Sequence, residues 1–349
     1  MVGSVQTVIG AVPRVSSSLT HADRWGTFKT RWGVGRMSYK VDPGLYALGD
    51  PDANSPVLVS ANYKMSFARL REALPGHNAW ILVLDTKGIN VWCAAGKGTF
   101  GTAEIVSRIE SSCLSQLVSH RRLILPQLAA PGVAAHLVKK PSGFAVIYGP
   151  VRADDLPVFL AGNMKATPEM RRKTFTLRER VALIPVEFVM AMKKAIVVMP
   201  VLVLLAGLLG LLRSGNFWTN VLSYGIHSAL ALFIGILAGA VLTPVLLPWL
   251  PGRAFSIKGL SIGLLAALGW AAIRFQAWGS WAGRFEILAW VLIIAAVAAY
   301  LAMNFTGAST YTSLSGVKKE IRLALPLQIG ACILGLVIWL GVLFGVIGG

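Results

Sequence analysis

The sequence predicts two modules: an α/β Rossmann-like domain followed by an all-α transmembrane domain of about five helices. Short β-branched runs alternate with helical stretches between residues 56 and 149, and long apolar runs fill the chain from Ala195 onward. The 349 residues also exceed the length of one typical domain. Apolar residues make up 55% of the chain and charged residues only 14%, so part of it is expected to lie in lipid.

The first 55 residues are rich in Gly, Ser, Pro and charge and show no sustained period, which predicts a loop-rich N-terminal lead-in. Their apolar run from Val8 to Val12 is followed by Pro13 and Arg14 and does not have the pattern of a signal peptide. The first module is therefore expected to stay in the cytoplasm.

Residues 56–165 are predicted to form the α/β domain, with a largely parallel sheet. The expected strands are Val57 to Ala61, Ala79 to Asp85, Leu123 to Leu125 and Ala145 to Tyr148. The expected helices are Met65 to Ala73, Thr102 to Val118 and Asp154 to Gly162.

Residues 166–194 are predicted to be a basic juxtamembrane linker, with a helix from Thr176 to Lys194 and a possible kink at Pro185. Its cations have two interpretations, contact with lipid head groups or an ordinary solvated face; they are Arg171, Arg172, Lys173, Arg178 and Arg180.

Five apolar runs in residues 195–349 are each long enough to cross a bilayer core: Ala195 to Leu212, Val221 to Leu247, Ile257 to Ile273, Glu286 to Met303 and Pro326 to Val346. The third run has a second interpretation, a re-entrant or interfacial helix, because three glycines lower its helix propensity: Gly259, Gly263 and Gly269. The glycine pairs at 207/210, 235/239 and 341/345 are expected to allow close helix contact.

Basic residues predict the orientation of these spans. Seven fall on the side of the first module: Lys193, Lys194, Arg253, Lys258, Lys318, Lys319 and Arg322. Three fall on the other side: Arg213, Arg274 and Arg284. The bias predicts a multi-pass protein of the cytoplasmic (inner) membrane with its N-terminal domain in the cytoplasm and Gly349 on the far face. His227 and Glu286 are expected near span ends, where they can reach the interface.

The net charge of +18 does not by itself indicate nucleic acid, because no basic-aromatic motif accompanies it. Basic residues exceed acidic ones in both modules, as cytoplasmic loops and anionic lipid require. The three cysteines are too few for an iron-sulfur cluster carried by the chain itself. Of these, Cys113 is expected to pack within a helix and Cys332 within the last span.

Chemistry is expected in Asp85 to Thr102, a segment that places four glycines, two lysines, a Trp and a Cys after a hydrophobic strand. Gly96, Gly98 and Gly101 spell a dinucleotide fingerprint, but the acidic residue expected about 20 positions later is missing. A phosphate loop is disfavoured because Gly98 follows Lys97 where Ser or Thr is required. Taken alone, Cys93 would be read as a buried, inert residue.

Eight consecutive residues resemble the signature of the HgcA family, the corrinoid proteins of microbial mercury methylation: Asn90, Val91, Trp92, Cys93, Ala94, Ala95, Gly96 and Lys97. The wider region, about residues 55–165, is similar to the corrinoid-binding part of the corrinoid iron-sulfur protein of the acetyl-CoA pathway. Five C-terminal membrane spans also agree with the layout of the family. The resemblance implies that these eight residues, with Gly98 and Thr99, bind a cobalamin-type corrinoid.

The resemblance implies that Cys93 is the lower axial ligand of the corrinoid cobalt and the central catalytic residue. Thiolate is a soft donor suited to a polarizable metal. Asn90 is expected to cap the segment and fix the direction of Cys93, while Gly96 and Gly98 allow the backbone to approach a flat ring. Trp92 either shields that face or packs in the core, and Lys97 either lowers the pKa of the thiol or meets a corrin amide. Whether the segment is a strand or a short cap helix is left open.

The same resemblance implies methyl transfer from the corrinoid to Hg(II), giving methylmercury. It also implies an electron donor, the ferredoxin-like HgcB with two 4Fe-4S clusters, and a methyl donor that is a protein or a folate. Two alternatives remain: a corrinoid methyl carrier with another acceptor, and a nucleotide-binding transport or tethering protein. Ser60 to Asn62 weakly resembles a loop near the corrinoid in these relatives and is not assigned to the site.

Overall fold

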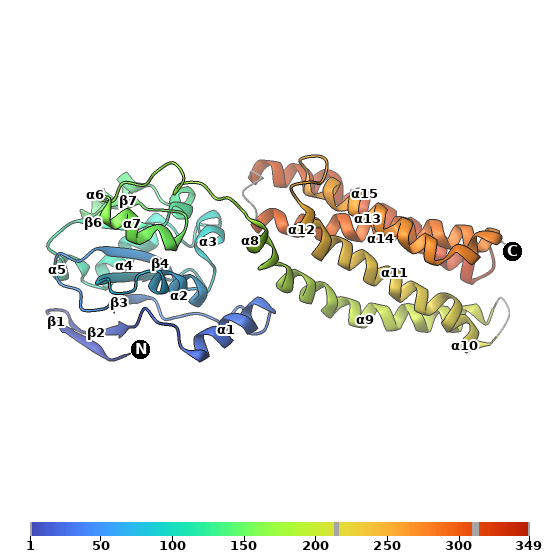
Figure 1. The fold of residues 1–349 in the computed structure, drawn as a ribbon, viewed down its shortest axis with the longest axis horizontal. Helices are drawn as coiled ribbons and strands as arrows, with labels where there is room; N and C mark the ends of the chain where they lie inside the picture. Colours follow the sequence, from blue (N-terminus) through green and yellow to red (C-terminus); the bar gives the residue numbers. More distant parts are fainter. Residues whose placement is uncertain (1, 213–215, 309–313, 348–349) are drawn as a thin grey trace. The chain divides into compact units, whose positions relative to one another are not determined.

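The chain forms two compact units, Met1–Thr174 and Phe175–Gly349 (Figure 1). The computed structural model describes residues 2–212, 216–308 and 314–347. The first unit is a mixed α/β domain and the second is helical, as the sequence predicts.

A seven-stranded sheet forms the centre of the first unit, in the order β1-β2-β3-β5-β4-β6-β7. Its strands are β1 (Ser4–Thr7), β2 (Gly10–Val15), β3 (Gly44–Leu48), β4 (Val57–Ala61), β5 (Ala79–Leu84), β6 (Arg122–Leu125) and β7 (Ala145–Tyr148). β5, β4, β6 and β7 are parallel, while β3 pairs antiparallel with β5 and β1 antiparallel with β2. The four predicted strands are confirmed, and the sheet is mixed rather than parallel throughout.

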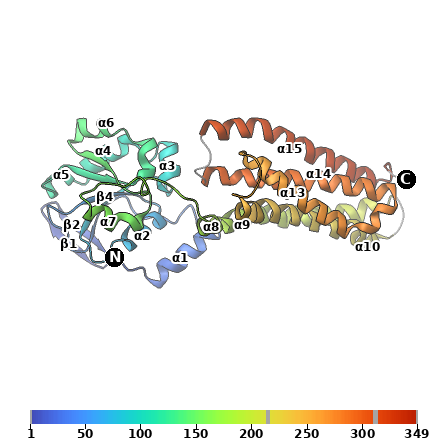
Figure 2. The same cartoon turned by 45° about the horizontal axis from the view of Figure 1, so that its top comes forward.

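Helices cover both faces of this sheet (Figure 2). One face packs against α4 (Thr102–Ser111), α5 (Leu114–Leu117) and α6 (Ala135–Ser142), and the other against α2 (Lys64–Glu72) and α7 (Leu156–Ala161). Along β5 the side chains alternate between the two cores, with Trp80, Leu82 and Leu84 in one and Ile81 and Val83 in the other. This alternation is the two-residue period of a strand buried on both faces.

The helix expected over Thr102 to Val118 is broken at Cys113. This residue adopts a left-handed conformation, with φ 46°, and its side chain is exposed between α4 and α5. The prediction that Cys113 packs inside a helix is therefore wrong. Cys332 lies within α15, as predicted.

The prediction of a loop-rich lead-in for residues 1–55 is also wrong. This region contains β1, β2, β3 and the helix α1 (His21–Arg31). β2 joins the main sheet by parallel pairing of Arg14 and Val15 with Ala47 and Leu48. Because this pairing connects residues more than 30 positions apart, the local pattern of the sequence does not show it.

A buried ion pair attaches this N-terminal region to the domain. Arg71 on α2 donates to Asp23 on α1 over 2.6 Å, and Lys64 lies 3.2 Å from the same carboxylate. Arg71 also donates to the carbonyl oxygens of Ser16 and Ser18. Burial raises the pKa of Asp23, but hydrogen bonds from Thr20, Arg71 and Lys64 outweigh it and bring the pKa down to about 2.

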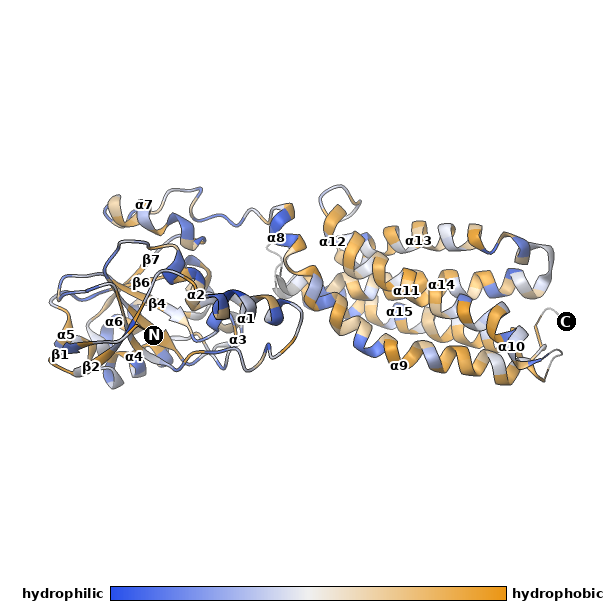
Figure 3. Ribbon diagram, turned by 60° about the horizontal axis from the view of Figure 1, so that its bottom comes forward, coloured by the Kyte–Doolittle hydropathy of each residue, from blue (hydrophilic) through white to orange (hydrophobic). Residues whose placement is uncertain are grey.

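The second unit contains five helical segments long and apolar enough to cross a membrane, among the described residues. Hydrophobic residues cover most of their length in Figure 3. The helices are α8 (Leu177–Val181), α9 (Ile184–Gly210), α10 (Phe217–Asn220), α11 (Ile226–Leu237), α12 (Thr243–Leu246), α13 (Phe255–Ile273), α14 (Trp281–Met303) and α15 (Leu314–Leu343). π-helical turns at Val221–Gly225 and Ala238–Leu242 join α10, α11 and α12 into the second segment.

The helix predicted from Thr176 to Lys194, running into the first span, is present as α8 and α9, and α9 is continuous from Ile184 through Lys193 and Lys194. Pro185 lies in the first turn of α9, where the missing N–H has no partner to lose, so it begins a helix rather than kinking one.

Glycines set the spacing between helices in this unit. A Cβ added to Gly239 would lie 2.6 Å from the carbonyl oxygen of Ala298 on α14, and one added to Gly259 would lie 2.5 Å from the Cβ of Ala302. Gly263 meets the same helix at Ala295. The third segment is thus a continuous packed helix in which Gly259 and Gly263 serve contact with α14, whereas a Cβ on Gly269 would meet nothing within 4 Å.

Glu286 lies near the start of α14 (Trp281–Met303), as predicted, but its side chain does not reach the surface of this unit. Its side chain is fully buried and accepts a hydrogen bond of 2.5 Å from Arg274, at the end of α13. α14, which carries Glu286, has 67% of its most apolar window buried, against 11% for the first span. His227 is half-buried, with Nδ1 3.1 Å from the carbonyl oxygen of Leu222.

Candidate functional site

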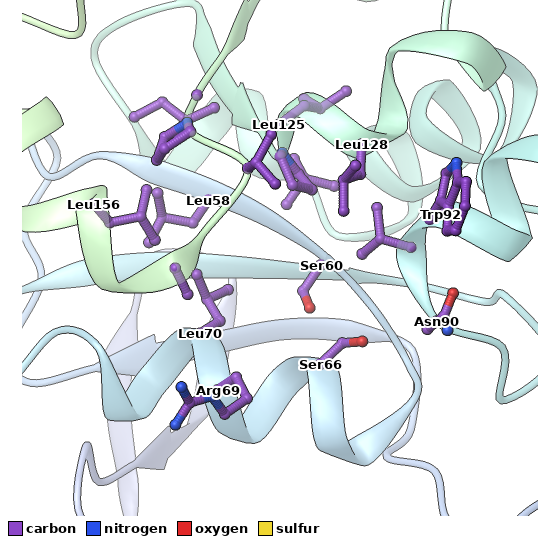
Figure 4. Close-up of a pocket in the computed structure, with 18 of the residues that line it drawn as sticks. Leu58, Ser60, Ser66, Arg69, Leu70, Asn90, Trp92, Leu125, Leu128 and Leu156 are labelled. Atoms are coloured by element: carbon purple, nitrogen blue, oxygen red, sulfur yellow. The ribbon is translucent and has the colours of Figure 1, made fainter. Parts of the chain in front are cut away.

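A cleft of about 380 Å³ lies at the carboxyl ends of the parallel strands (Figure 4). In chain order the four parallel strands are β4, β5, β6 and β7, and in space β4 lies between β5 and β6. The chain direction across the sheet therefore reverses between β4 and β6. Open α/β sheets bind ligands at this kind of switch point.

The lining of the cleft is mostly apolar. Figure 4 shows Leu58, Leu70 and Leu156 at one end of the cleft and Asn90 and Trp92 at the other. The polar side chains include Ser60 from β4, Ser66 and Arg69 from α2, and Asn90, and residues 149–151 after β7 also line the cleft. An apolar wall with a few polar groups is typical of a site for a cofactor or small molecule.

The segment expected to carry chemistry leaves β5 through a loop held by Asn62. The side chain of Asn62 is buried, and its Oδ1 accepts from the Thr86 backbone, the Thr86 hydroxyl and the Gly88 backbone at 3.2, 2.9 and 2.9 Å. Its Nδ2 donates to Asp85 over 3.2 Å. A residue after β4 thereby fixes the path of the chain after β5.

The charged side chains next to this loop form ion pairs. Lys87 donates to Asp85, and this hydrogen bond lowers the pKa of Asp85 and raises that of Lys87. Glu104 on α4 accepts from the Asp85 backbone over 2.8 Å and pairs with Arg108. The loop is therefore anchored from both sides.

The signature residues form a short helix, α3 (Val91–Lys97). Asn90 is its N-cap, since Asn90 Oδ1 accepts a hydrogen bond of 2.9 Å from the Cys93 backbone N–H. The predicted capping role of Asn90 is confirmed. Of the two structures that the sequence left open for this segment, a strand or a short helix, the helix is the one observed.

Cys93 lies in the first turn of α3, directly after Asn90, Val91 and Trp92, which line the cleft. Its side chain is half-buried and is not itself part of the lining. Within the described residues, no group of three or more His, Cys, Asp or Glu side chains is placed to hold a metal ion.

The remaining signature residues do not line the cleft. Within α3, Ala94 and Ala95 are on the buried side, and Gly96 and Lys97 are exposed. Gly98 ends α3 in a left-handed conformation, φ 80°. Thr99 follows with its hydroxyl 3.4 Å from the carbonyl oxygen of Ala94. Corrinoid contact by residues 94–99 stays a prediction.

The three glycines of the dinucleotide pattern lie in a helix–turn–helix instead of a strand–loop–helix. Gly96 is inside α3, Gly98 ends it, and Gly101 is the N-cap of α4. A Cβ on Gly101 would lie 2.7 Å from the carbonyl oxygen of Gly98, so this glycine allows a tight turn between two helices. The geometry disfavours a dinucleotide site here.

Several lining residues were not predicted from the sequence. Ser60 lines the cleft although the sequence did not assign it to the site, and Arg69, which pairs with Glu72 and Asp154, was not predicted either. Asn62, also unassigned, does not line the cleft but holds the loop beside it. Their position in the sequence could have indicated a role, because Ser60 and Asn62 lie at or just past the carboxyl end of a buried parallel strand, where ligands bind.

Comparison with known proteins agrees with this location. Residues 33–159 match a family model. The family is described as CO dehydrogenase/acetyl-CoA synthase delta subunit. The matched region contains every strand that lines the cleft, and α2 and α3 as well.

Curated relatives are similar over the same region. Subunit gamma of the acetyl-CoA decarbonylase/synthase complex from Methanopyrus kandleri is 35% identical over 127 residues, 36% of this chain and 27% of that protein. The subunits gamma of Archaeoglobus fulgidus and Methanocaldococcus jannaschii are 30% and 31% identical, over 37% and 40% of this chain. The chain spans 27% to 29% of the length of these relatives.

Proposed function

We propose that the first unit binds a corrinoid at the cleft, with Cys93 as lower axial ligand of its cobalt, and passes a methyl group to Hg(II). The observation that carries the proposal is the position of Cys93. It lies one residue beyond the cleft lining, on a helix whose first turn is fixed by Asn90. The eight-residue signature and the similarity to acetyl-CoA decarbonylase/synthase subunits support the cofactor class.

The residues of the cleft fit such a cofactor. Apolar side chains such as Leu58, Leu125 and Leu128 provide a surface for the face of a ring, and Ser60 and Ser66 provide hydroxyls for peripheral amides. A thiol supplies the soft donor that a polarizable metal prefers.

A bound corrinoid would supply a methyl group that an electrophile such as Hg(II) can accept, and the Cys93 thiolate would donate electron density to its metal. The protein side chains provide positioning. Asn90 fixes the backbone at Cys93, Asn62 fixes the loop before it, and the half-buried Trp92 covers one end of the cleft.

The proposal includes the partners implied by the resemblance. An external ferredoxin-like donor, HgcB with two 4Fe-4S clusters, would return cobalt to its reduced state, because the three cysteines lie on α3, between α4 and α5, and on α15. A protein or a folate would supply the methyl group. We also propose that the helical unit holds the chain in the cytoplasmic membrane, with the first unit on the cytoplasmic side.

A second candidate is a corrinoid methyl carrier with another acceptor. The names of the relatives favour it, since these belong to acetyl-CoA decarbonylase/synthase complexes rather than to mercury chemistry. The two candidates share the role of Cys93 and differ in the acceptor.

The test is methylmercury formation in cells that express the full chain together with its ferredoxin-like donor, supplied with Hg(II). Cys93→Ala is expected to abolish methylmercury, and Cys113→Ala, at an exposed thiol outside the cleft, to leave it unchanged. Unchanged output from Cys93→Ala would refute the proposal. A wild-type chain that carries a corrinoid yet forms no methylmercury would favour the second candidate.

A further inference from the structure

The helix α1 has an inverted arrangement of polar and apolar residues. Its inner face carries Asp23 and Thr30, both buried, and Gly26, where a Cβ would lie 2.6 Å from the hydroxyl of Tyr39. A surface helix normally turns its apolar side chains toward the core. Here the core side of the helix is polar.

The opposite face of α1 and the turn after it carry large aromatic side chains in solvent. Trp25, Phe28 and Trp32 are 58%, 49% and 40% exposed, and they follow the three- and four-residue spacing of one helical face. The rings of Trp25 and Phe28 stack with centroids 5.3 Å apart, and those of Phe28 and Trp32 are 6.1 Å apart. Val34 and Met37, 57% and 72% exposed, extend this apolar surface.

Cations flank this surface. Arg24, Lys29, Arg31 and Arg36 lie within residues 21–37, and Asp23 is the one acidic residue in that stretch of sequence. The Asp23 carboxylate faces inward to Arg71 and Lys64, and so does not offset the cations outside. Lys29 Nζ lies 5.9 Å from the ring centroid of Trp25. The outer surface of residues 21–37 is thus a row of aromatic side chains surrounded by cations.

We propose that residues 21–37 form an interfacial anchor that inserts its aromatic row into an anionic lipid surface. Trp and Phe on one side with Lys and Arg beside them are typical of helices that lie in the membrane interface. Each cation near such a surface strengthens binding. The chain also has five segments long enough to span a bilayer, which keep this surface close to lipid at high effective concentration.

The anchor is continuous with the rim of the cleft. The Arg36 guanidinium lies 5.9 Å from the ring centroid of Tyr63, and Tyr63 lines the cleft. Lys40 forms a β-bridge with the same tyrosine, and Tyr39 accepts a backbone hydrogen bond from Lys64. Insertion of residues 21–37 therefore brings that rim to the lipid head groups.

The test places a photoreactive aromatic residue, p-benzoylphenylalanine, at Phe28 of the full chain in nanodiscs. Nanodiscs of phosphatidylcholine alone are compared with an equal mixture of phosphatidylcholine and phosphatidylglycerol. The matched control carries the probe at Leu137, which is 50% exposed on α6 beside the exposed Lys139 and Lys140 but has no aromatic row. Lipid adducts are counted by mass spectrometry.

The anchor predicts about tenfold more lipid adduct at position 28 than at 137 in the anionic discs. The adduct is expected to fall by a similar factor in phosphatidylcholine alone, or when Arg24, Lys29 and Arg31 are changed to Glu. Adducts to protein instead of lipid would overturn the proposal in favour of a protein partner. Equal yields at the two positions, or equal yields in the two lipids, would also overturn it. Hydrogen–deuterium exchange of residues 64–74 checks that each variant retains the fold of α2.

Discussion

Asn62 gives a sharp prediction, because one buried side chain holds the loop that leads to Cys93. In Asn62→Ala the backbone N–H of Gly88 loses its acceptor, the Thr86 N–H keeps only the carbonyl oxygen of Leu84, and Asp85 loses a donor. Leaving one buried donor without a partner costs about 1 to 3 kcal/mol, so we expect roughly 2 kcal/mol for local opening. Since about 1.4 kcal/mol is a factor of ten, the loop should open about thirtyfold more often.

Hydrogen–deuterium exchange of the full chain measures this opening at the amides of residues 86–88. Asn62→Asp, which keeps an acceptor oxygen, should retain most of the protection. Asn54→Ala, at an exposed asparagine, should leave these amides unchanged. Wild-type exchange rates in Asn62→Ala would refute the view that this side chain positions the segment.

Three further changes have expected outcomes. The pKa of Asp23 is held at about 2, below its usual 3.8, so its stabilisation is complete above pH 4 and is lost as the pH falls toward 2. Urea unfolding of the first unit should show this loss of about 2 kcal/mol, and Asp23→Asn should remove it. Glu286→Ala leaves the largely covered Arg274 side chain without its partner and should cost about 3 kcal/mol in detergent. Gly259→Ala should cost about 1 to 3 kcal/mol, because its Cβ would meet α14.

Each change has a control that can contradict it. If the stability of Asp23→Asn falls with pH as it does in the wild type, other carboxyl groups cause the loss. The double variant Glu286→Leu/Arg274→Leu should recover most of the stability lost in Glu286→Ala, and failure to do so would argue against an unpaired charge as the cause. Gly269→Ala, with open space around its Cβ, should be tolerated, and an equal cost there would remove the packing explanation.

The sequence predicted elements whose pattern is local. β4 and β7 were found at their observed bounds, since buried parallel strands are short β-branched runs between turns. The N-terminal strands were missed, because β2 contains Gly10 and Pro13 and depends on pairing with β3. The burial of Glu286 was not predicted for a related reason: its partner, Arg274, lies at the end of the preceding helix.

The candidate site was predicted in part. The signature located α3, and side-chain chemistry located the cap at Asn90. The cleft combines residues after β4, β6 and β7 with α2 and α3, and the order of strands that brings them together is not visible in any local window. Arg69 could not be assigned on this basis, and Ser60 was left out although it lies at a strand end.

A bond between the Cys93 sulfur and cobalt should be visible in the absorption spectrum of the full chain loaded with a corrinoid, compared with Cys93→Ala and with Cys113→Ala. Cys93→Ala is expected to shift the absorption bands to those of a corrinoid without a thiolate ligand, whereas Cys113→Ala should keep the wild-type spectrum. Identical spectra for wild type and Cys93→Ala, with corrinoid bound in both, would contradict such a bond.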